Sequence, residues 1–399
     1  MQILEGSRAI ALTIKNIKPN VISAYPITPQ THIVEDLAQF KADGKADYEY
    51  VRAESEFAAA SIVEGASAQG VRVYSATCSQ GLLLMSEVLF NIAGMRLPVV
   101  FTFANRGLSA PITIWNDQQD VMTIRDAGWL IFFAENHQEA VEQHVLAYKV
   151  AEKNNLPASV NIDGYVLTHS YEPVEIPEAK KIKKFLPDYK PKKNMKLDPE
   201  EPRTMGSFAP PAHYMEIRQQ LHNDLLDSVA TIKKEYDRYR QIFGNTNTAS
   251  KKKVKIDNGL MEYYGPRLPK TLIVAMGSVV GTVKEAVDET RKKVGVLKLK
   301  TYRPFPAEEI QKTIKELNPK HIAVLDKSIS LGNMGPLAAD LRSTFQSPIP
   351  NLKTSRYHPN IQSFIVGLGG RDITRDKIKD IIKKAEKKNK NNKHGLFVN

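Results

Sequence analysis

Short apolar runs alternate with amphipathic stretches from Gly6 to about Glu175, and this alternation constrains the fold more than any other feature of the sequence. An apolar run of about four to eight residues between turn residues predicts a buried strand, and the longer stretches predict helices. The predicted strands are Val21–Tyr25, Tyr48–Val51, Val71–Ser75, Pro98–Phe103, Trp129–Phe133 and Ala158–Ile162. Helices are predicted between them, for example at Glu54–Gln69, Gln80–Gly94 and Gln138–Lys153. This order predicts a mainly parallel, doubly wound α/β sheet with helices on both faces.

The second half repeats the alternation on a smaller scale. Its predicted strands are Thr271–Ala275, Val294–Leu299, His321–Leu325 and Ser363–Gly367. Its predicted helices are Val280–Lys292, Ala307–Leu317, Pro336–Thr344 and Asp376–Lys387. At 399 residues the chain is longer than one domain normally is. We therefore predict two α/β domains, over residues 1–248 and 249–399.

The segment between the two alternating regions has a different character. Tyr171–Arg203 is rich in Pro and Lys and predicts an extended connection. Tyr214–Ile242 has a long helical pattern rich in charge, which suits a helix laid over a domain surface or a subunit junction. The basic, polar stretch Asn245–Lys255 then separates the halves.

Charge and cysteine content exclude several functions. The net charge is +12, but much of the excess lies in Lys180–Lys193 and Lys383–Lys393, which are poor in the aromatic residues of a nucleic-acid-binding surface. We interpret these segments as a solubilising linker and a frayed tail, or as a field that steers an acidic protein partner. The single cysteine, Cys78, excludes an internal disulfide and a Cys-ligated zinc or iron–sulfur site made by this chain alone. No apolar run could span a bilayer and no signal-peptide pattern is present, so we expect a cytoplasmic protein without membrane contact.

The turn Tyr25-Pro26-Ile27-Thr28-Pro29 follows the first predicted strand. Ligands of open α/β sheets bind beyond the carboxyl ends of strands, and two prolines would hold the Thr28 hydroxyl in a stiff loop there. The alternative is an ordinary strand-to-helix turn with Thr28 as helix N-cap and Pro29 at the first helical position. The sequence of the turn alone leaves both interpretations open.

Glu56 opens a helix whose following residues, Phe57-Ala58-Ala59-Ala60, are mostly small and apolar. A carboxylate at a helix start gains from the helix dipole, and small neighbours would let a flat ring approach. Equally, Glu54 and Glu56 could merely favour a helix N-terminus. In Ala76–Met85 a strand joins a helix through a polar turn with one glycine, which offers free backbone N–H groups near Ser79 and Gln80. Cys78 in that turn is interpreted as a packing residue, since no nearby histidine would activate it.

Arg106 follows the strand Pro98–Phe103, and therefore lies on the same predicted sheet edge as Thr28. A guanidinium group there suits a small carboxylate substrate, which it can bind through two parallel hydrogen bonds. The alternative is a structural arginine paired with Asp117 or Asp120. These two aspartates lack further metal-ligand spacing, so we interpret them as capping and positioning residues and predict no metal site. The nine histidines are scattered, and none forms a zinc spacing.

Ordered motifs from both halves together resemble the alpha subunits of the 2-oxoacid:ferredoxin oxidoreductase family, and within it the pyruvate:ferredoxin oxidoreductase (pyruvate synthase) type. The first half carries YPITPQT at Tyr25–Thr31, ESEFAAA at Glu54–Ala60, SQGLLLM at Ser79–Met85, NRGLSAPI at Asn105–Ile112, IWNDQQD at Ile114–Asp120, RDAGW at Arg125–Trp129 and DGYVLTH at Asp163–His169. The second half carries MGS at Met276–Ser278, GVLKLKTYRPFP at Gly295–Pro306, LDKSISLGNMGPL at Leu325–Leu337 and GLGGRD at Gly367–Asp372. Each motif alone is weak, but the ordered set covers nearly the whole chain.

The resemblance implies oxidative decarboxylation of a 2-oxo acid on thiamine diphosphate, with coenzyme A accepting the acyl group and ferredoxin or flavodoxin the electrons. It implies a pyrimidine-type thiamine-diphosphate-binding domain followed by a transketolase C-terminal-like domain. Glu56 matches the glutamate that hydrogen-bonds the pyrimidine ring and promotes loss of the thiazolium proton. Thr28 and Arg106 would bind the 2-oxo acid, and Pro26, Ile27, Ser79 and Gln80 would line the cofactor.

Parts that this reaction requires are missing from the sequence. We find no Gly-Asp-Gly-type segment with a downstream Asn for Mg²⁺ and the diphosphate, and no cysteines for electron-transfer clusters. The resemblance therefore implies a complex with beta, gamma and delta subunits, in which beta supplies the diphosphate half and Mg²⁺ and delta the [4Fe-4S] clusters. A branched-chain 2-oxo acid such as 2-oxoisovalerate is an alternative substrate. A non-catalytic scaffold subunit is an alternative of another class, against which Thr28, Glu56 and Arg106 together argue.

Overall fold

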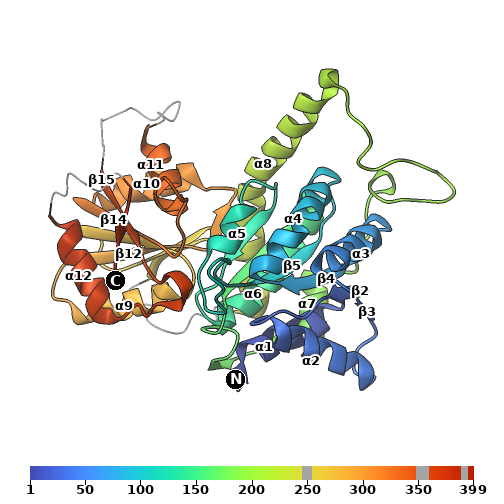
Figure 1. The fold of residues 1–399 in the computed structure, drawn as a ribbon, viewed down its shortest axis with the longest axis horizontal. Coiled ribbons are helices and arrows are strands. Elements are labelled where there is room, and N and C mark those ends of the chain that lie inside the picture. Colours follow the sequence, from blue (N-terminus) through green and yellow to red (C-terminus); the bar gives the residue numbers. More distant parts are fainter. Residues whose placement is uncertain (245–253, 347–358, 388–393) are drawn as a thin grey trace.

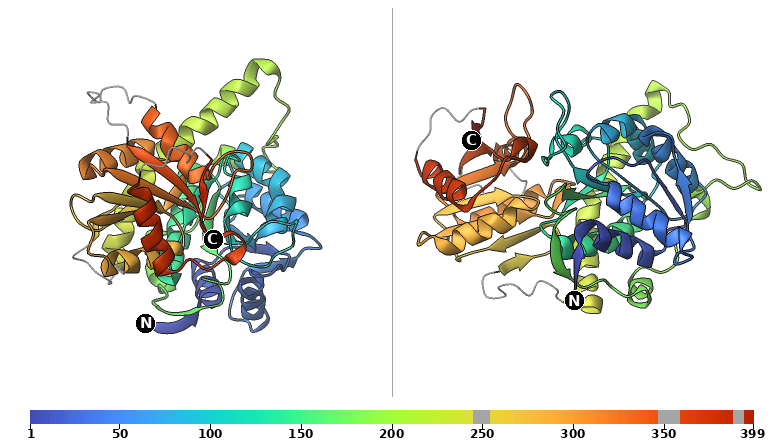
Figure 2. Two further views of the ribbon diagram at one scale, coloured as in Figure 1. Left: turned by 60° about the vertical axis from the view of Figure 1, so that its left-hand side comes forward. Right: turned by 60° about the horizontal axis from the view of Figure 1, so that its bottom comes forward.

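Two seven-stranded sheets organise the chain, one in each half, and they lie side by side in every view (Figure 1, Figure 2). The computed structural model describes residues 1–244, 254–346, 359–387 and 394–399. The mixed α/β architecture predicted from the alternating pattern is confirmed. The boundary predicted at residues 248/249, and most of the basic stretch Asn245–Lys255, lie outside the described residues.

The first sheet has the strand order β13-β6-β7-β5-β4-β2-β3. Its strands are β2 (Val21–Ala24), β3 (Glu49–Arg52), β4 (Val73–Thr77), β5 (Val100–Asn105), β6 (Leu130–Phe133), β7 (Ala158–Asp163) and β13 (Thr301–Arg303). Every neighbouring pair is parallel except β13 and β6. Strands β4, β5, β6 and β7 are buried throughout, as expected when helices cover both faces of a parallel sheet.

The helices that precede or connect the strands of the first sheet form two packed sets. These helices are α1 (Gly6–Ile17), α2 (Thr31–Ala42), α3 (Glu56–Ala68), α4 (Ser79–Gly94), α5 (Gln119–Thr123) and α6 (His137–Asn154). Helix α3 packs on α4 and α4 on α5, whereas α1 packs on α2 and α6. Crossovers between parallel strands are right-handed, and the connection β2–α2–β3 runs along the sheet in the opposite direction to β4–α4–β5. The topological switch point therefore lies between β2 and β4.

The second sheet has the strand order β16-β15-β14-β11-β12-β10-β9. Its strands are β9 (Val254–Asp257), β10 (Met261–Tyr264), β11 (Thr271–Ala275), β12 (Val294–Leu299), β14 (His321–Asp326), β15 (Asn360–Ile365) and β16 (Leu396–Phe397). The helices of this half are α9 (Val279–Glu289), α10 (Ala307–Leu317), α11 (Pro336–Gln346) and α12 (Arg375–Ala385), with a short 3₁₀ turn at Leu368–Gly370. Strands β11, β12, β14, β15 and β16 are parallel, and β10 is antiparallel to both of its neighbours.

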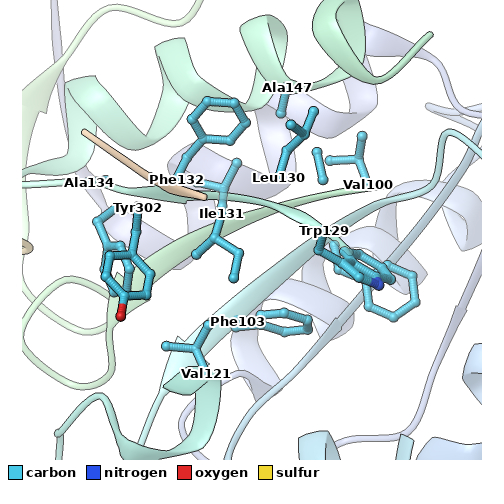
Figure 3. Packing of buried hydrophobic residues seen from close by; sticks show 14 of the residues in the cluster. Val100, Phe103, Val121, Trp129, Leu130, Ile131, Phe132, Ala134, Ala147 and Tyr302 are labelled. Atoms are coloured by element: carbon cyan, nitrogen blue, oxygen red, sulfur yellow. The ribbon is translucent and has the colours of Figure 1, made fainter. Parts of the chain in front are cut away.

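Strand β13 belongs to the second half by sequence but to the first sheet by pairing. Its Tyr302 is fully buried, and its ring meets Phe133 of β6 edge-on at 6.3 Å between centroids. Figure 3 shows Tyr302 beside Ile131 and Phe132, in the same apolar cluster as Trp129 and Phe103. Because this strand of the second half pairs with the first sheet, the two halves share one hydrophobic core.

Buried ion pairs also join the halves. Lys298 of β12 lies 2.6 Å from Glu135 and 3.1 Å from Glu139 of the first half, and 3.2 Å from Glu262 of β10. Burial opposes ionisation of Glu139, but the ammonium groups of Lys298 and Lys300 outweigh it and lower its pKa to about 2. Charges this deeply buried persist because each has partners of opposite sign.

The prediction of an extended connection over Tyr171–Arg203 is partly wrong. Its first residues form β8 (Tyr171–Val174), which pairs antiparallel with β1 (Gln2–Glu5) in a separate ribbon, and α7 (Ala179–Phe185) follows. The rest is irregular apart from one 3₁₀ turn at Lys193–Met195. The long helix is confirmed as α8 (Pro211–Phe243), which packs on α6 and α7 while its other end projects from the molecule (Figure 1).

Candidate functional site

The loops that follow β2, β4 and β5 meet at the topological switch point of the first sheet. This is where open α/β folds bind ligands, because strand order reverses there and leaves a crevice at the carboxyl edge. The loop after β2 carries Thr28, Ser79 and Gln80 begin helix α4 directly after β4, and the loop after β5 carries Arg106. The structure therefore gathers the site residues predicted from these three loops at one edge.

Gln30 holds the loop Tyr25–Pro29 in place. Its buried side chain donates to the carbonyl oxygen of Ala76 on β4 at 2.6 Å and accepts from the N–H of Ile27 at 3.3 Å. Pro26 and Thr28 are exposed and Ile27 is half-buried, so the loop presents side chains outward while its backbone is fixed. The alternative that Thr28 caps the next helix is wrong, since α2 begins at Thr31 with Gln30 at the N-cap.

Glu56 is the first residue of α3, and its side chain is buried. Ser55 caps the helix by accepting a hydrogen bond from the N–H of Ala58 at 3.1 Å, which fixes the helix start. A methyl group at Gly81 of α4 would lie 2.6 Å from Oε1 of Glu56 and 2.4 Å from Oγ1 of Thr77. Glycine therefore allows the three groups to lie together.

The carboxylate of Glu56 forms no hydrogen bond or ion pair with the described parts of the chain, although Glu56 is only 7% exposed. The neighbouring hydroxyl of Thr77 is buried and likewise has no hydrogen-bond partner among those residues. Buried polar groups are normally satisfied, so such unpartnered groups indicate a ligand. A carboxyl group beside a glycine fits a flat heterocycle that offers a ring nitrogen.

Arg106 is buried and contacts the loop after β2. Its Nη1 donates to the carbonyl oxygen of Thr28 at 2.8 Å, and its Nε donates to that of Thr113 at 2.7 Å. Its side chain forms no ion pair with Asp117 or Asp120. The alternative that Arg106 is a structural residue paired with one of these aspartates is therefore wrong. Within the described ranges Nη2 makes no hydrogen bond to an oxygen atom, while the guanidinium group also interacts with the Cys78 thiol.

Asp120 ties the loops after β4 and β5 together. Its Oδ2 accepts from the N–H groups of Ser79 and Arg106, both at 3.0 Å, and Oδ1 accepts from Asn105 Nδ2 at 3.1 Å. Burial raises the pKa of Asp120 to about 7, against the lowering effect of these backbone donors. The predicted positioning role fits this geometry, in which the aspartate fixes two loops rather than contacting solvent.

Ser79 and Gln80 differ in exposure. Ser79 is fully buried, has φ of 48°, and its hydroxyl lies 2.6 Å from both the carbonyl oxygen of Gly107 and Oε1 of Gln80. Gln80 is half-buried. Cys78 is buried and its thiol contacts the carbonyl oxygen of Thr28 at 3.1 Å, while burial raises its pKa well above the usual range. This agrees with a packing role for Cys78.

The segment Ile114–Asp120 and Asp163 at the end of β7 contact the second half, through residues whose roles the sequence did not reveal. The ammonium of Lys327 lies 2.9 Å from Oδ2 of Asp163, and the N–H of Gln118 donates to the carbonyl oxygen of Lys327 at 2.8 Å. Burial opposes ionisation of Asp163, but Lys327 and the hydroxyl of Ser278 hold its pKa below its usual range. Ser278 of the motif MGS and Lys327 of the motif LDKSISLGNMGPL therefore hold Asp163 and Gln118 in place next to the candidate site.

No helix in the described part of the chain combines the length and apolar character needed to cross a bilayer.

Two family descriptions match the chain. Residues 13–238 match "Pyruvate flavodoxin/ferredoxin oxidoreductase, thiamine diP-bdg", and residues 270–378 match "Pyruvate:ferredoxin oxidoreductase core domain II". The first match contains every site residue described above that precedes the second half.

Curated relatives are similar over nearly the full length. The chain is 44% identical over 393 residues to the pyruvate synthase subunit PorA of Methanocaldococcus jannaschii, covering 97% of this chain and 95% of the relative. It is 42% identical over 391 residues to the subunit of that name from Pyrococcus furiosus, with 97% and 93% covered. The ketoisovalerate oxidoreductase subunit VorA of Pyrococcus abyssi is 38% identical over 389 residues, with 97% and 93% covered.

Solved structures share the fold. A 2-oxoglutarate:ferredoxin oxidoreductase from Magnetococcus marinus superposes with a TM-score of 0.70 at 20% identity, over 97% of this chain. This chain spans 65% of the length of that solved chain. A split-gene transketolase, described as an inactive beta4 tetramer, superposes with a TM-score of 0.52 at 10% identity, over 95% of this chain and 96% of that chain.

Proposed function

The chain belongs to the pyruvate flavodoxin/ferredoxin oxidoreductase family, and we propose that it is the alpha subunit of a pyruvate synthase. This enzyme oxidatively decarboxylates pyruvate to acetyl-coenzyme A and CO₂, passes two electrons to ferredoxin or flavodoxin, and can run in reverse. Relatives named as pyruvate synthase subunits are 41–44% identical to the chain, whereas the ketoisovalerate subunits are 38% identical. The pyruvate enzyme is therefore favoured over the branched-chain one.

The buried, unpartnered carboxyl group of Glu56 is the observation that supports a catalytic role for this chain. Thiamine diphosphate, when bound, supplies a stabilised carbanion at its thiazolium ring and thereby permits loss of CO₂ from a 2-oxo acid. Glu56 would hydrogen-bond the pyrimidine ring nitrogen of the bound cofactor, and a proton shared across that bond would tune the basicity of the ring. Gly81 leaves room for the Glu56 carboxyl group, because a methyl group at Gly81 would lie 2.6 Å from its Oε1.

Thr28 and Arg106 bind pyruvate in this proposal. The exposed Thr28 hydroxyl donates to an oxygen of the 2-oxo acid, and the Arg106 guanidinium group binds its carboxylate. Pro26 and Ile27 on the outward side of the loop, and Ser79 and Gln80 at the start of α4, line the cofactor. Asp120 and Gln30 keep these loops in register.

The remaining chemistry is assigned to partners. A beta subunit would hold Mg²⁺ and the diphosphate, a delta subunit the [4Fe-4S] clusters, and a gamma subunit would complete the complex. Coenzyme A is the cosubstrate, as it is a ligand in the Magnetococcus structure. The sequence's single cysteine, Cys78, is buried, which agrees with clusters held elsewhere.

The substrate is tested with the complex co-purified from a host that expresses all subunits. We expect pyruvate to give a higher kcat/KM than 2-oxoisovalerate or 2-oxoglutarate, measured with an artificial electron acceptor. A preference for 2-oxoisovalerate would replace the pyruvate assignment with the branched-chain one. An assembled complex that retains full activity without this chain would instead identify a scaffold subunit.

Replacing Arg106 with Ala is expected to raise the KM for pyruvate roughly 10- to 100-fold, because a hydrogen-bonded charge contributes about 1.5–3 kcal/mol. The KM for coenzyme A should change far less. Steady-state kinetics on the assembled complex measure both values. An equal rise in both would identify Arg106 as a structural residue that only supports Thr28 and Thr113.

A further inference from the structure

Two histidines and a glutamate from separate segments converge outside the candidate site. Glu5 ends β1, His32 lies in the first turn of α2, and His169 lies in the turn between β7 and β8. Each offers one ligand atom, and the three atoms all lie within 4.8 Å of one another. Zinc ligands lie about 2.0–2.2 Å from the ion, so ligand atoms bound to one ion are roughly 3–4 Å apart. Small side-chain rotations would bring the three atoms to that spacing.

The backbone around Glu5 and His169 is fixed before any ligand arrives. Glu5 pairs with Tyr171 in the ribbon of β1 and β8, and the N–H of Gly6 donates to the carbonyl oxygen of Ser170 at 3.2 Å. A Cβ on Gly6 would lie 1.7 Å from the carbonyl oxygen of Leu167, so glycine is required for this close approach. The backbone contacts between these two segments therefore fix the positions of Glu5 and His169 relative to each other.

The two imidazole rings are close, and one is held by an outer partner. The rings of His32 and His169 lie 4.6 Å apart at 39°, and Nδ1 of His32 lies 2.7 Å from Oε1 of Glu5. Nδ1 of His169 lies 2.6 Å from the hydroxyl of Thr168, which is fully buried. Metal-binding histidines commonly bond their second nitrogen in this way, because it fixes the ring and the tautomer. In the tautomer that carries its proton on Nδ1 and donates it to Thr168, Nε2 of His169 presents a lone pair.

A simple ion pair between His32 and Glu5 explains only part of this arrangement. It does not involve His169, whose ring lies 4.6 Å from that of His32 at a tilt of 39°. Carboxylates of Glu35 and Asp36 line the same open cavity of about 560 Å³ as Glu5 and His32, and they favour a cation. Arg52 lines the same cavity and Arg8 pairs with Asp36, and both offset part of this negative charge.

We propose that Glu5, His32 and His169 bind a divalent transition-metal ion of the zinc type, with water completing the coordination. Two imidazole nitrogens and one carboxylate oxygen are a ligand set that suits Zn²⁺, Co²⁺ and Ni²⁺. The ion joins α2 to the ribbon of β1 and β8. It also braces the ring of His169, which packs on Tyr165 at 4.6 Å, and Tyr165 packs on Trp115 of the Ile114–Asp120 loop at 5.0 Å.

Sequence spacing could not reveal this group, because 27 residues separate Glu5 from His32, and strands β3 to β7 lie between His32 and His169. The prediction of no metal site considered only the spacing of the histidines along the sequence. The site forms through the pairing of β1 with β8, which the sequence did not predict.

The test uses the full-length chain after dialysis against a chelator. Titration with Zn²⁺ followed by calorimetry should show one equivalent bound, and Co²⁺ should give visible absorption bands of a nitrogen- and oxygen-ligated ion. His32→Gln and His169→Gln should each weaken Zn²⁺ binding at least tenfold, and Thr168→Val about tenfold. His213→Gln, at an exposed position on α8, is the matched control and should bind as the parent does.

Thermal unfolding in chelator separates loss of the site from loss of the fold. Without metal, His32→Gln and His169→Gln should unfold at the parent temperature, and only the parent and His213→Gln should gain full stability from Zn²⁺. Absence of Zn²⁺ binding by the parent would overturn the proposal. So would binding that His32→Gln and His169→Gln leave unchanged, since the ion would then lie elsewhere.

Discussion

Replacing Glu56 with Gln in the assembled complex is expected to lower kcat for pyruvate oxidation roughly 10²- to 10⁴-fold, the range that a positioned proton-transfer group contributes. An amide keeps the size of the side chain but cannot hold and release the proton. Because the side chain of Glu56 makes no hydrogen bond to the described residues, the substitution breaks no side-chain hydrogen bond on which the fold depends. Steady-state kinetics, with subunit composition checked by size-exclusion chromatography, measure the effect.

Glu54→Gln is the matched control. Glu54 lies two residues earlier and is exposed, so this variant makes the same chemical change outside the site and should keep parental activity. Near-normal turnover of the Glu56→Gln variant would contradict the catalytic assignment of Glu56. A complex that fails to assemble would indicate that the glutamate serves α3 or a subunit contact instead.

The sequence predicted most strands and helices of both sheets, because buried parallel strands are continuous apolar runs and their connecting helices are amphipathic. It missed β1 and β8, whose residues are largely exposed or half-buried and lack any clear alternation. It also missed β13, which has only three residues and pairs with a strand far away in sequence. Short strands of this kind are specified by tertiary contacts rather than by local pattern.

The candidate site was predictable to the extent that it follows from topology. Thr28, Ser79 and Arg106 each follow a parallel strand, so their common edge could be inferred from the order of elements. The residues that hold these loops were not predictable in the same way. Gln30 and Asp120 act through hydrogen bonds to backbone groups 46 and 41 residues away, respectively, and such bonds leave no periodic trace in the sequence.

The charged residues between the halves were equally hidden. Lys298 lies in β12 and Lys300 directly follows it, and lysines at alternate positions are typical of the exposed face of a strand. Both side chains are nevertheless buried against carboxylates of the first half. Sequence pattern reports polarity, whereas burial of a paired charge depends on a partner supplied by a distant segment. Asp163 and Lys327 are the corresponding pair behind the candidate site.

Replacing Lys327 with Met is expected to destabilise the folded chain by about 3–5 kcal/mol, because Asp163 is left as a buried charge without its counter-ion. Asp163 is 1% and Lys327 5% exposed, so water cannot replace the ammonium group. The folded-state pKa of Asp163 is depressed, so the pair stabilises the chain at pH values above the unfolded-state pKa of about 4. As the pH falls below that value, the difference between the parent and the variant should shrink. Urea unfolding of the full-length chain at several pH values measures both effects.

Two further variants separate the charge effect from the loss of a side chain. Asp163→Asn combined with Lys327→Met removes the orphaned charge and should recover part of the loss, because an amide can still accept from Ser278. Lys379→Met removes an ammonium group 2.7 Å from Glu289 at the surface and should cost far less than Lys327→Met, because water screens an exposed ion pair. If Lys327→Met lowers the free energy of unfolding no more than Lys379→Met does, the pair Lys327–Asp163 does not stabilise the contact between the halves. If the double variant is no more stable than Lys327→Met, packing of the lysine stem and its contact with Asn116, rather than the charge of Asp163, would account for the effect.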